Sequence, residues 1–246
     1  MLNSYTNNTR VLILVLLVGL SSAVLPAQAA EQTPVVVELF TSQGCSSCPP
    51  ADAYLGELAR RPDVLALSYH VDYWNYIGWI DPFGSKAATQ RQRDYAKHLN
   101  LRYVYTPQMV VNGTSEGIGS EREAIETLIH AAQREAPARQ GISITRNPDG
   151  RLAVHVDGGG SAELAKIVLV GFDDERVTPV SSGENEGRTL REYQIVRSYE
   201  AVGNWQGESV DIIVPADRVP GGGVAVLLQT ASGHIIGAAQ LKAPTS

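Results

Sequence analysis

The chain has 246 residues, which is enough for one or two domains. Its 26 acidic residues outnumber its 20 basic residues and give a formal net charge of -6. Because the sequence contains no basic stripe and no polybasic tail, we expect neither nucleic acid nor an anionic membrane surface to be a partner.

The first 29 residues have the pattern of a secretory signal peptide. Arg10 precedes an uncharged apolar run, Val11–Val18, and Ala27-Gln28-Ala29 is a suitable cleavage sequence. A membrane anchor is the alternative, but the apolar run is shorter than the roughly 20 residues that a spanning helix needs. We therefore expect cleavage after residue 29, no membrane association afterwards, and a periplasmic or secreted location.

A β–α–β unit is expected at the start of the mature chain. The β-branched apolar run Pro34–Phe40 predicts a buried parallel strand. The pair Cys45-x-x-Cys48 then opens a helix, because Pro49 and Pro50 suit a first helical turn. The apolar run Val64–Val71 predicts the second strand, parallel to the first.

The next segment predicts two further strands and two further helices. A polar helix is expected over Ser85–Leu99, and Ser120 can cap a later one. Between them, Asn112-Gly113 favours a two-residue hairpin that joins strands at Gln108–Val111 and Thr114–Ile118. The expected order of elements is β-α-β-α-β-β-α.

Beyond Arg139 the pattern changes to short alternating runs separated by glycine, proline and asparagine. Such strands with turn signals and no long helix predict an antiparallel sandwich, of which the immunoglobulin-like arrangement is one form. We expect one domain at 30–139, a β-rich domain at 140–246, and an exposed loop at 181–188. The expected strands are Ile142–Arg146, Leu152–Val156, Ile167–Phe172, Glu192–Tyr199, Val210–Val214, Val224–Thr230 and Ile235–Leu241.

The two cysteines are the only ones in the chain, and they lie three positions apart. A thiolate at a helix N-terminus has a lowered pKa, which favours attack on a disulfide. We expect Cys45 to attack a substrate sulfur and Cys48 to resolve the mixed disulfide. A static local disulfide and one half of a metal site are the alternatives.

Three other side chains are candidates for supporting roles. Glu38 is a charged residue in an apolar strand, either facing the surface or buried behind the cysteines as a proton partner of Cys48. Trp74 and Trp79 follow the second strand and could bind substrate at the edge of the sheet where the cysteines lie. Packing of these aromatic rings is the alternative.

Over Glu38–Asp52 and at Thr106-Pro107, the sequence resembles a family of exported bacterial thioredoxin-like proteins that is catalogued mainly as a domain of unknown function. The resemblance implies a thioredoxin-like fold of order β-α-β-α-β-β-α followed by a β-rich part, and it supplies no substrate. Gly44 and Ser46-Ser47 differ from the residues of well-studied reductases and oxidases, so the direction of electron flow stays open.

The resemblance also implies a role for Thr106-Pro107. In the thioredoxin fold, a cis proline at this place faces the cysteines, and the backbone of the preceding residue pairs with a substrate chain. A trans proline that starts an edge strand is the alternative.

Our leading hypothesis is an exported thiol–disulfide oxidoreductase that needs no cofactor and acts on a protein or small-molecule thiol or disulfide. The first alternative is a metal-handling protein that binds Cu(I) or Zn(II) through Cys45, Cys48 and His70. The second is a non-catalytic binding module, in which the sandwich docks a partner and the disulfide is static.

Overall fold

The computed structural model describes residues 33–135, 139–159 and 163–242, together with Met1. From residue 33 onwards, the described chain belongs to one compact unit. The predicted signal peptide, residues 1–29, lies outside the described residues apart from Met1. In the described part of the chain, no helix has the length and apolar character needed to cross a membrane.

The first half of the chain has the predicted order of elements. A 3-10 turn, η1 (Asn75–Ile77), is added in the loop between the second strand and the second helix, which carries Trp74 and Trp79. The elements are β1 (Val35–Thr41), α1 (Pro49–Leu58), β2 (Val64–His70), α2 (Lys86–His98), β3 (Gln108–Val111), β4 (Ser115–Ile118) and α3 (Arg122–Arg134).

Two local predictions in this half have different outcomes. The hairpin is confirmed, because Asn112 and Gly113 have φ values of 46° and 71°, the left-handed conformations that its tight turn requires. The cap is wrong by one residue: Glu121, not Ser120, is the N-cap of α3, and no side chain caps this helix.

The second half is β-rich, as predicted. Each predicted strand is present, although two of them are much longer than expected. The strands are β5 (Ile142–Arg146), β6 (Leu152–Val156), β7 (Ala165–Pro179), β8 (Thr189–Trp205), β9 (Val210–Val214), β10 (Gly223–Thr230) and β11 (Ile235–Leu241), with a 3-10 turn, η3 (Ala216–Arg218), before β10.

These strands do not form a sandwich of their own. One eight-stranded sheet has the order β11-β10-β7-β8-β2-β1-β3-β4, and a separate three-stranded sheet has the order β5-β6-β9. The link between the two halves is the parallel contact of β8 with β2, at Ile195 and Ser68. Pairing with β8 covers the edge that β2 would otherwise expose. The sheet therefore runs across the predicted boundary at 139/140.

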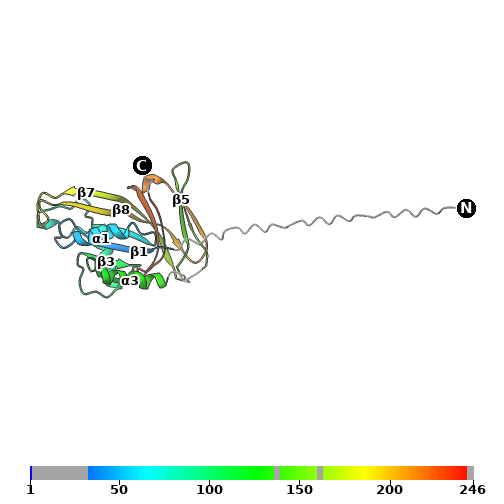
Figure 1. The fold of residues 1–246 in the computed structure, drawn as a ribbon, viewed down its shortest axis with the longest axis horizontal. Coiled ribbons are helices and arrows are strands. Elements are labelled where there is room, and N and C mark those ends of the chain that lie inside the picture. The colour runs from blue at the N-terminus through cyan, green and yellow to red at the C-terminus, as the bar shows by residue number, and fades with distance from the viewer. Residues whose placement is uncertain (2–32, 136–138, 160–162, 243–246) are drawn as a thin grey trace. The chain divides into compact units, whose positions relative to one another are not determined.

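The length of β7 and β8 explains this arrangement. They have 15 and 17 residues and form a long antiparallel hairpin, in which β8 lies against α1 and β2 (Figure 1). Gly56 of α1 lies directly against the ring of Tyr193 of β8, where a side chain on α1 would clash. The absence of a β-carbon at this position lets the helix and the hairpin pack closely.

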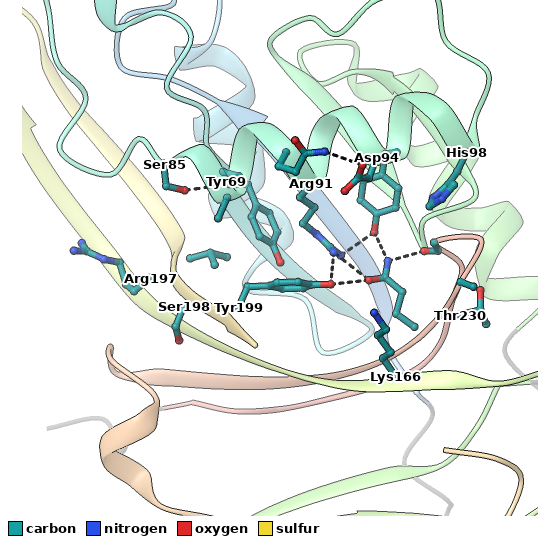
Figure 2. Close-up of a pocket in the computed structure, with 18 residues that line it drawn as sticks. Tyr69, Ser85, Arg91, Asp94, His98, Lys166, Arg197, Ser198, Tyr199 and Thr230 are labelled. Atoms are coloured by element: carbon teal, nitrogen blue, oxygen red, sulfur yellow. Dashed lines mark hydrogen bonds between the residues drawn. The ribbon is translucent and has the colours of Figure 1, made fainter. Parts of the chain in front are cut away.

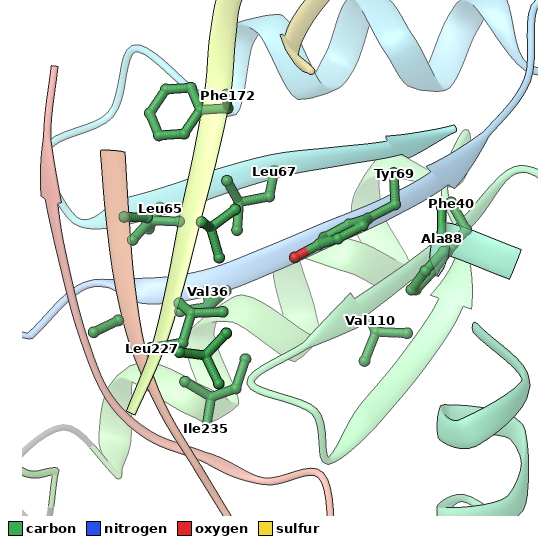
Figure 3. Packing of buried hydrophobic residues seen from close by; sticks show 14 of the residues in the cluster. Val36, Phe40, Leu65, Leu67, Tyr69, Ala88, Val110, Phe172, Leu227 and Ile235 are labelled. Carbon is green, nitrogen blue, oxygen red and sulfur yellow. The ribbon is translucent and has the colours of Figure 1, made fainter. Parts of the chain in front are cut away.

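The two faces of the large sheet carry different cores. On one face, α1 and α3 pack on Val37 and Leu39 of β1. On the other face, Val36 and Phe40 pack with Tyr95 of α2 and with strands from the second half (Figure 3). Since side chains alternate along a strand, the residue at position 38 must face α2 rather than α1. The second core includes Val168, Val170, Phe172, Ala225 and Leu227.

The three-stranded sheet packs against one end of the large sheet. Leu152 and Val154 of β6 lie in one cluster with Ile167 of β7, Trp205 of β8 and Val226 of β10. This is sheet-on-sheet packing, so the predicted sandwich is present locally, although its larger layer continues into the N-terminal strands.

Candidate functional site

Cys45 and Cys48 form a disulfide between the end of β1 and the start of α1, with their Cα atoms 5.5 Å apart. Both residues are buried, with exposed fractions of 2% for Cys45 and 0% for Cys48. Their pairing is consistent with a redox pair and with a static disulfide alike.

The cysteines are placed differently on the helix from the prediction. The helix begins at Pro49 and has Cys48 as its N-cap, so Cys45 lies in the preceding turn rather than at the helix start. The prolines fix the start because each has the helical φ and lacks an N–H group. The turn is closed by the Cys48 amide, which donates to the Cys45 carbonyl at 3.2 Å.

The two tryptophans lie against the loop that carries the cysteines. Trp79 donates its indole N–H to Oε1 of Gln43 at 2.9 Å. The Cα of Gly44 approaches Trp74 so closely that a β-carbon built there would lie 3.1 Å from the Trp74 Cβ. Glycine at position 44 therefore suits this close approach, since a β-carbon there would make a tight contact that Trp74 would have to relieve by shifting.

The Thr106–Pro107 peptide bond is cis, as expected from the resemblance. The Thr106 hydroxyl accepts a hydrogen bond of 2.8 Å from the indole N–H of Trp74. Because Trp74 also contacts Gly44, it connects the Thr106-Pro107 segment to the cysteine loop. The structure thus brings together the predicted residues Cys45, Cys48, Thr106, Pro107, Trp74 and Trp79.

Glu38 is the predicted residue that does not join this group. It is fully buried, but it lies on the face of the sheet that packs against α2, opposite α1. Arg91 of α2 binds both carboxylate oxygens, with Nε and Nη2 each at 2.9 Å, and the Tyr95 hydroxyl also donates to the carboxylate. Neither prediction for Glu38 is correct: it is not at the surface, and it is not behind the cysteines.

A cavity of about 540 Å³ opens beside this ion pair, between α2 and strands β7, β8 and β10. The guanidinium of Arg91 lies among the rings of Tyr69, Tyr95 and Tyr199, and it donates to the Tyr199 hydroxyl and to Gln229 (Figure 2). The cavity is on the α2 face, so it is separate from the disulfide.

A different acid lies close to the cysteines. Asp52 is one helical turn after Cys48, and its amide donates to the Cys48 carbonyl at 3.1 Å. Its side chain is buried, and burial raises the pKa of its carboxyl to about 7, although the positive charge of His70 opposes this shift. The carboxyl therefore exchanges a proton near neutral pH.

Asp52 belongs to a cluster of buried polar groups under the cysteine loop. His70, at the end of β2, lies 2.7 Å from Asp81, and this carboxylate also accepts the amide of Gln43 at 2.8 Å. Burial lowers the pKa of His70, but the charge and hydrogen bond of Asp81 outweigh it and raise the pKa to about 9. From β8, Glu192 accepts the side-chain amide of Gln43 at 2.8 Å.

Several atoms of this cluster are buried without a hydrogen-bond partner among the described residues. They are Oδ1 of Asp52, Nε2 of His70, Oε1 of Glu192 and the Thr41 hydroxyl. An unpartnered buried polar atom is costly and uncommon, and it often marks a functional site. In the described ranges, however, no three His, Cys, Asp or Glu side chains are arranged to hold a metal ion.

The sequence contained a signal for some of these residues. Asp52 follows Cys48 by four positions, and on a helix this spacing places two side chains on the same face. His70 lies near the end of the predicted strand Val64–Val71. The strand expected beside it, Pro34–Phe40, leads into the cysteine loop. Nothing in the sequence pointed to Glu192, because the pairing of β8 with β2 brings it to the site from the second half of the chain.

Comparison with known proteins identifies the family. A family model described as "Protein of unknown function (DUF1223)" matches residues 36–229. The chain belongs to the DUF1223 family. Protein AGR_C_4864 from Agrobacterium tumefaciens, known from a crystal structure, has 37% sequence identity to this chain. The two structures match with a TM-score of 0.78, over 89% of this chain and 98% of that one.

A more distant likeness concerns the fold alone. HBP35 of Porphyromonas gingivalis is 16% identical, with a TM-score of 0.55, and the match covers 86% of this chain and 76% of that protein. No curated protein matches the chain.

Proposed function

We propose that this DUF1223 protein is an exported thiol–disulfide oxidoreductase with a thioredoxin-like N-terminal part. The observation that carries the proposal is the Cys45–Cys48 disulfide with the buried Asp52 one helical turn away. A disulfide that serves only to link two residues has no need of an acid with a pKa near 7 beside it.

The thioredoxin-like assignment is supported by order and placement. The elements β1 to α3 follow the order β-α-β-α-β-β-α, and the cysteine pair lies between the first strand and the first helix. The Thr106-Pro107 segment lies near the same loop through Trp74. Export is supported by the signal-peptide pattern of residues 1–29.

The proposed reaction moves two electrons between the cysteine pair and a substrate. In the reducing direction, the Cys45 thiolate bonds to one sulfur of a substrate disulfide, and the other substrate sulfur leaves as a thiolate and takes a proton from water. The ionised carboxyl of Asp52 takes the proton of Cys48, whose thiolate then attacks Cys45. The second substrate thiolate leaves as the Cys45–Cys48 disulfide re-forms.

The oxidising direction is the reverse of these steps. The substrate thiolate attacks Cys45, Cys48 leaves as a thiolate, and the protonated Asp52 returns the proton to it. A carboxyl with a pKa near 7 is suited to both directions, since about half of the molecules carry the proton at neutral pH.

The test is to trap the partner. In Cys48→Ser, the mixed disulfide at Cys45 has no resolving thiol, so we expect covalent adducts from the native compartment that dithiothreitol removes. Cys45→Ser is the matched control and should give none. If both variants give the same adducts, or if neither gives any, the assignment of Cys45 as the attacking residue is wrong.

The two alternatives predict different results. A metal-handling protein should bind Cu(I) or Zn(II) tightly in its reduced form, which native mass spectrometry of the metal-loaded protein would detect. A non-catalytic module should keep its disulfide when it is treated with a mild reductant and should not cycle.

A further inference from the structure

Residues 181–188, in the loop between β7 and β8, are mostly exposed, as the sequence predicts, but Asn185 in their middle is buried. We call this stretch the tip segment. It folds back over the cysteine loop, about 140 positions earlier in the chain, and its Asn185 has an exposed fraction of only 1%. This contact is separate from the reaction described above, because no group of the tip segment takes part in it.

Hydrogen bonds attach the tip segment directly to the backbone around Cys45. The side-chain amide of Asn185 donates to the carbonyls of Gln43, at 2.8 Å, and Cys45, at 3.0 Å. The amide of Ser46 donates to the carboxylate of Glu184 at 3.3 Å. The tip segment therefore forms hydrogen bonds with the backbone of Gln43, Cys45 and Ser46.

Two further contacts fix the tip segment to the loop between β2 and α2, which carries Trp74 and Trp79. The hydroxyl of Ser182 donates to the carbonyl of Gly78 at 2.6 Å. Gly183, with φ of 78°, lies against Trp79, where a β-carbon would be 3.1 Å from the Trp79 Cβ. The Arg188 guanidinium holds the Asn185 carboxamide in place through a hydrogen bond of 3.0 Å to its Oδ1.

The composition of the tip segment makes these contacts easy to exchange. Residues 181–188 are Ser, Ser, Gly, Glu, Asn, Glu, Gly and Arg, so the nearest apolar anchor, the buried Val180, lies at the base of the segment and not within it. Water or another chain can replace a hydrogen bond, whereas a buried apolar anchor would resist displacement. Gly183 and Gly187, both at positive φ, lie near its two ends.

Access to Cys45 is the consequence. A sulfur that attacks the disulfide must approach Cys45, whose exposed fraction is 2% while the tip segment makes these contacts. We propose that the tip segment determines the specificity of the redox site: it covers Cys45, and a partner protein must replace its contacts with the backbone of Gln43, Cys45 and Ser46 before a sulfur can reach the disulfide. This inference rests on the proposed function.

The partner that fits is an extended polypeptide segment. The groups that the tip segment engages are two carbonyls and one amide of the backbone, which an extended chain can satisfy with its own amides and carbonyls. A small thiol offers too few such groups to displace the tip segment, so it should reduce the disulfide slowly.

The test measures reduction of the oxidised full chain by glutathione. One glutathione thiolate bonds to Cys45 as Cys48 leaves and takes a proton; a second then attacks the glutathione sulfur and leaves glutathione disulfide and the dithiol protein. We expect Asn185→Ala to be reduced at least tenfold faster than the unaltered protein. Glu186→Ala, a neighbouring exposed residue of the same tip, should stay within twofold.

A second variant guards against loss of folding. Glu184 is exposed, so Glu184→Ala should fold normally, release the Ser46 amide and accelerate reduction by a smaller factor. The proposal is overturned if Asn185→Ala and Glu184→Ala react at the unaltered rate, or if Glu186→Ala accelerates reduction as much as Asn185→Ala. Fast reduction of Asn185→Ala together with no trapped partner for Cys48→Ser would instead refute the proposed function alone.

Discussion

The amide of Asp52 donates to the carbonyl of Cys48, and this 3.1 Å contact fixes the acid one turn along α1 from the resolving cysteine. Asp52 belongs to α1, which packs on one face of the large sheet. The buried acid of β1, Glu38, faces the other side. The structure therefore replaces the predicted proton partner Glu38 by Asp52, and each carboxyl can be tested by substitution.

The first prediction concerns the pH dependence of thiol–disulfide exchange. Asp52→Asn removes the proton acceptor, so we expect the single-turnover rate at pH 7 to fall about 100-fold, the low end for general acid–base catalysis. The unaltered protein should show an inflection near pH 7 that the variant lacks. Asp94→Asn, at a half-exposed acid of α2 far from the cysteine loop in the sequence, is the control. An unchanged profile in Asp52→Asn would exclude Asp52 as the proton partner.

The second prediction concerns stability. Burial raises the pKa of Asp52 from 3.8 to about 7, so the folded protein holds a proton that the unfolded chain has lost between these values. The free energy of unfolding should therefore fall as the pH rises from 4 to 7. Asp52→Asn cannot ionise, and above pH 7 it should be more stable by a few kcal/mol, at about 1.4 kcal/mol per pKa unit.

Urea unfolding at a series of pH values would measure this effect. His70 contributes in the same direction, but over a different range, since its pKa rises from 6.5 to about 9 on folding. Its contribution is complete below pH 6.5 and is lost as the pH rises through 9. The variant should therefore lose the part of the slope between pH 4 and 7 that Asp52 contributes, while Glu192, whose pKa burial also raises, keeps its own part. A slope identical to that of the unaltered protein would exclude Asp52.

The third prediction separates Glu38 from the redox site. Glu38→Gln leaves the buried Arg91 without its counter-charge, which should cost about 3–5 kcal/mol of unfolding free energy. Glu57→Gln breaks the exposed ion pair with Arg122 and should leave the free energy of unfolding almost unchanged. Urea unfolding measures both. The pH profile of exchange should not change in Glu38→Gln; a profile like that of Asp52→Asn would restore Glu38 as the proton partner.

The fourth prediction concerns the boundary at 139/140. Residues 30–139 alone would lack Val168, Val170 and Phe172, which complete the core on the α2 face of the sheet, and β2 would have an open edge. We expect this fragment to show no cooperative thermal transition by circular dichroism, whereas the chain from residue 30 to the end should show one. A cooperative transition in the fragment would establish an independent N-terminal domain.

The order of local elements was accessible from the sequence because local forces determine it. Pro49 and Pro50 set the start of α1, and Asn112-Gly113 sets the turn between β3 and β4. The alternation of apolar and polar residues located the strands of the second half, several of them with the observed bounds. Each of these signals depends on residues that are neighbours along the chain.

The site was only partly accessible, because half of it is built by contacts between distant parts of the chain. The cysteine pair and its place after a strand could be predicted, and so could the cis bond at Pro107, through the family resemblance. Whether Glu38 faces the cysteine helix or α2 depends on which helix packs on each face of the sheet. The sequence of one strand does not specify that.

By itself, the sequence determined that a strand, a Cys-x-x-Cys turn and a helix follow one another, because spacing and turn chemistry act over a few residues. Only the tertiary structure decided what surrounds the disulfide. The pairing of β8 with β2 extends the sheet across both halves, and it brings Glu192 under the cysteine loop and Asn185 over it. Such pairing is chosen by the burial of shared apolar surface among strands far apart in the chain, which no local pattern records.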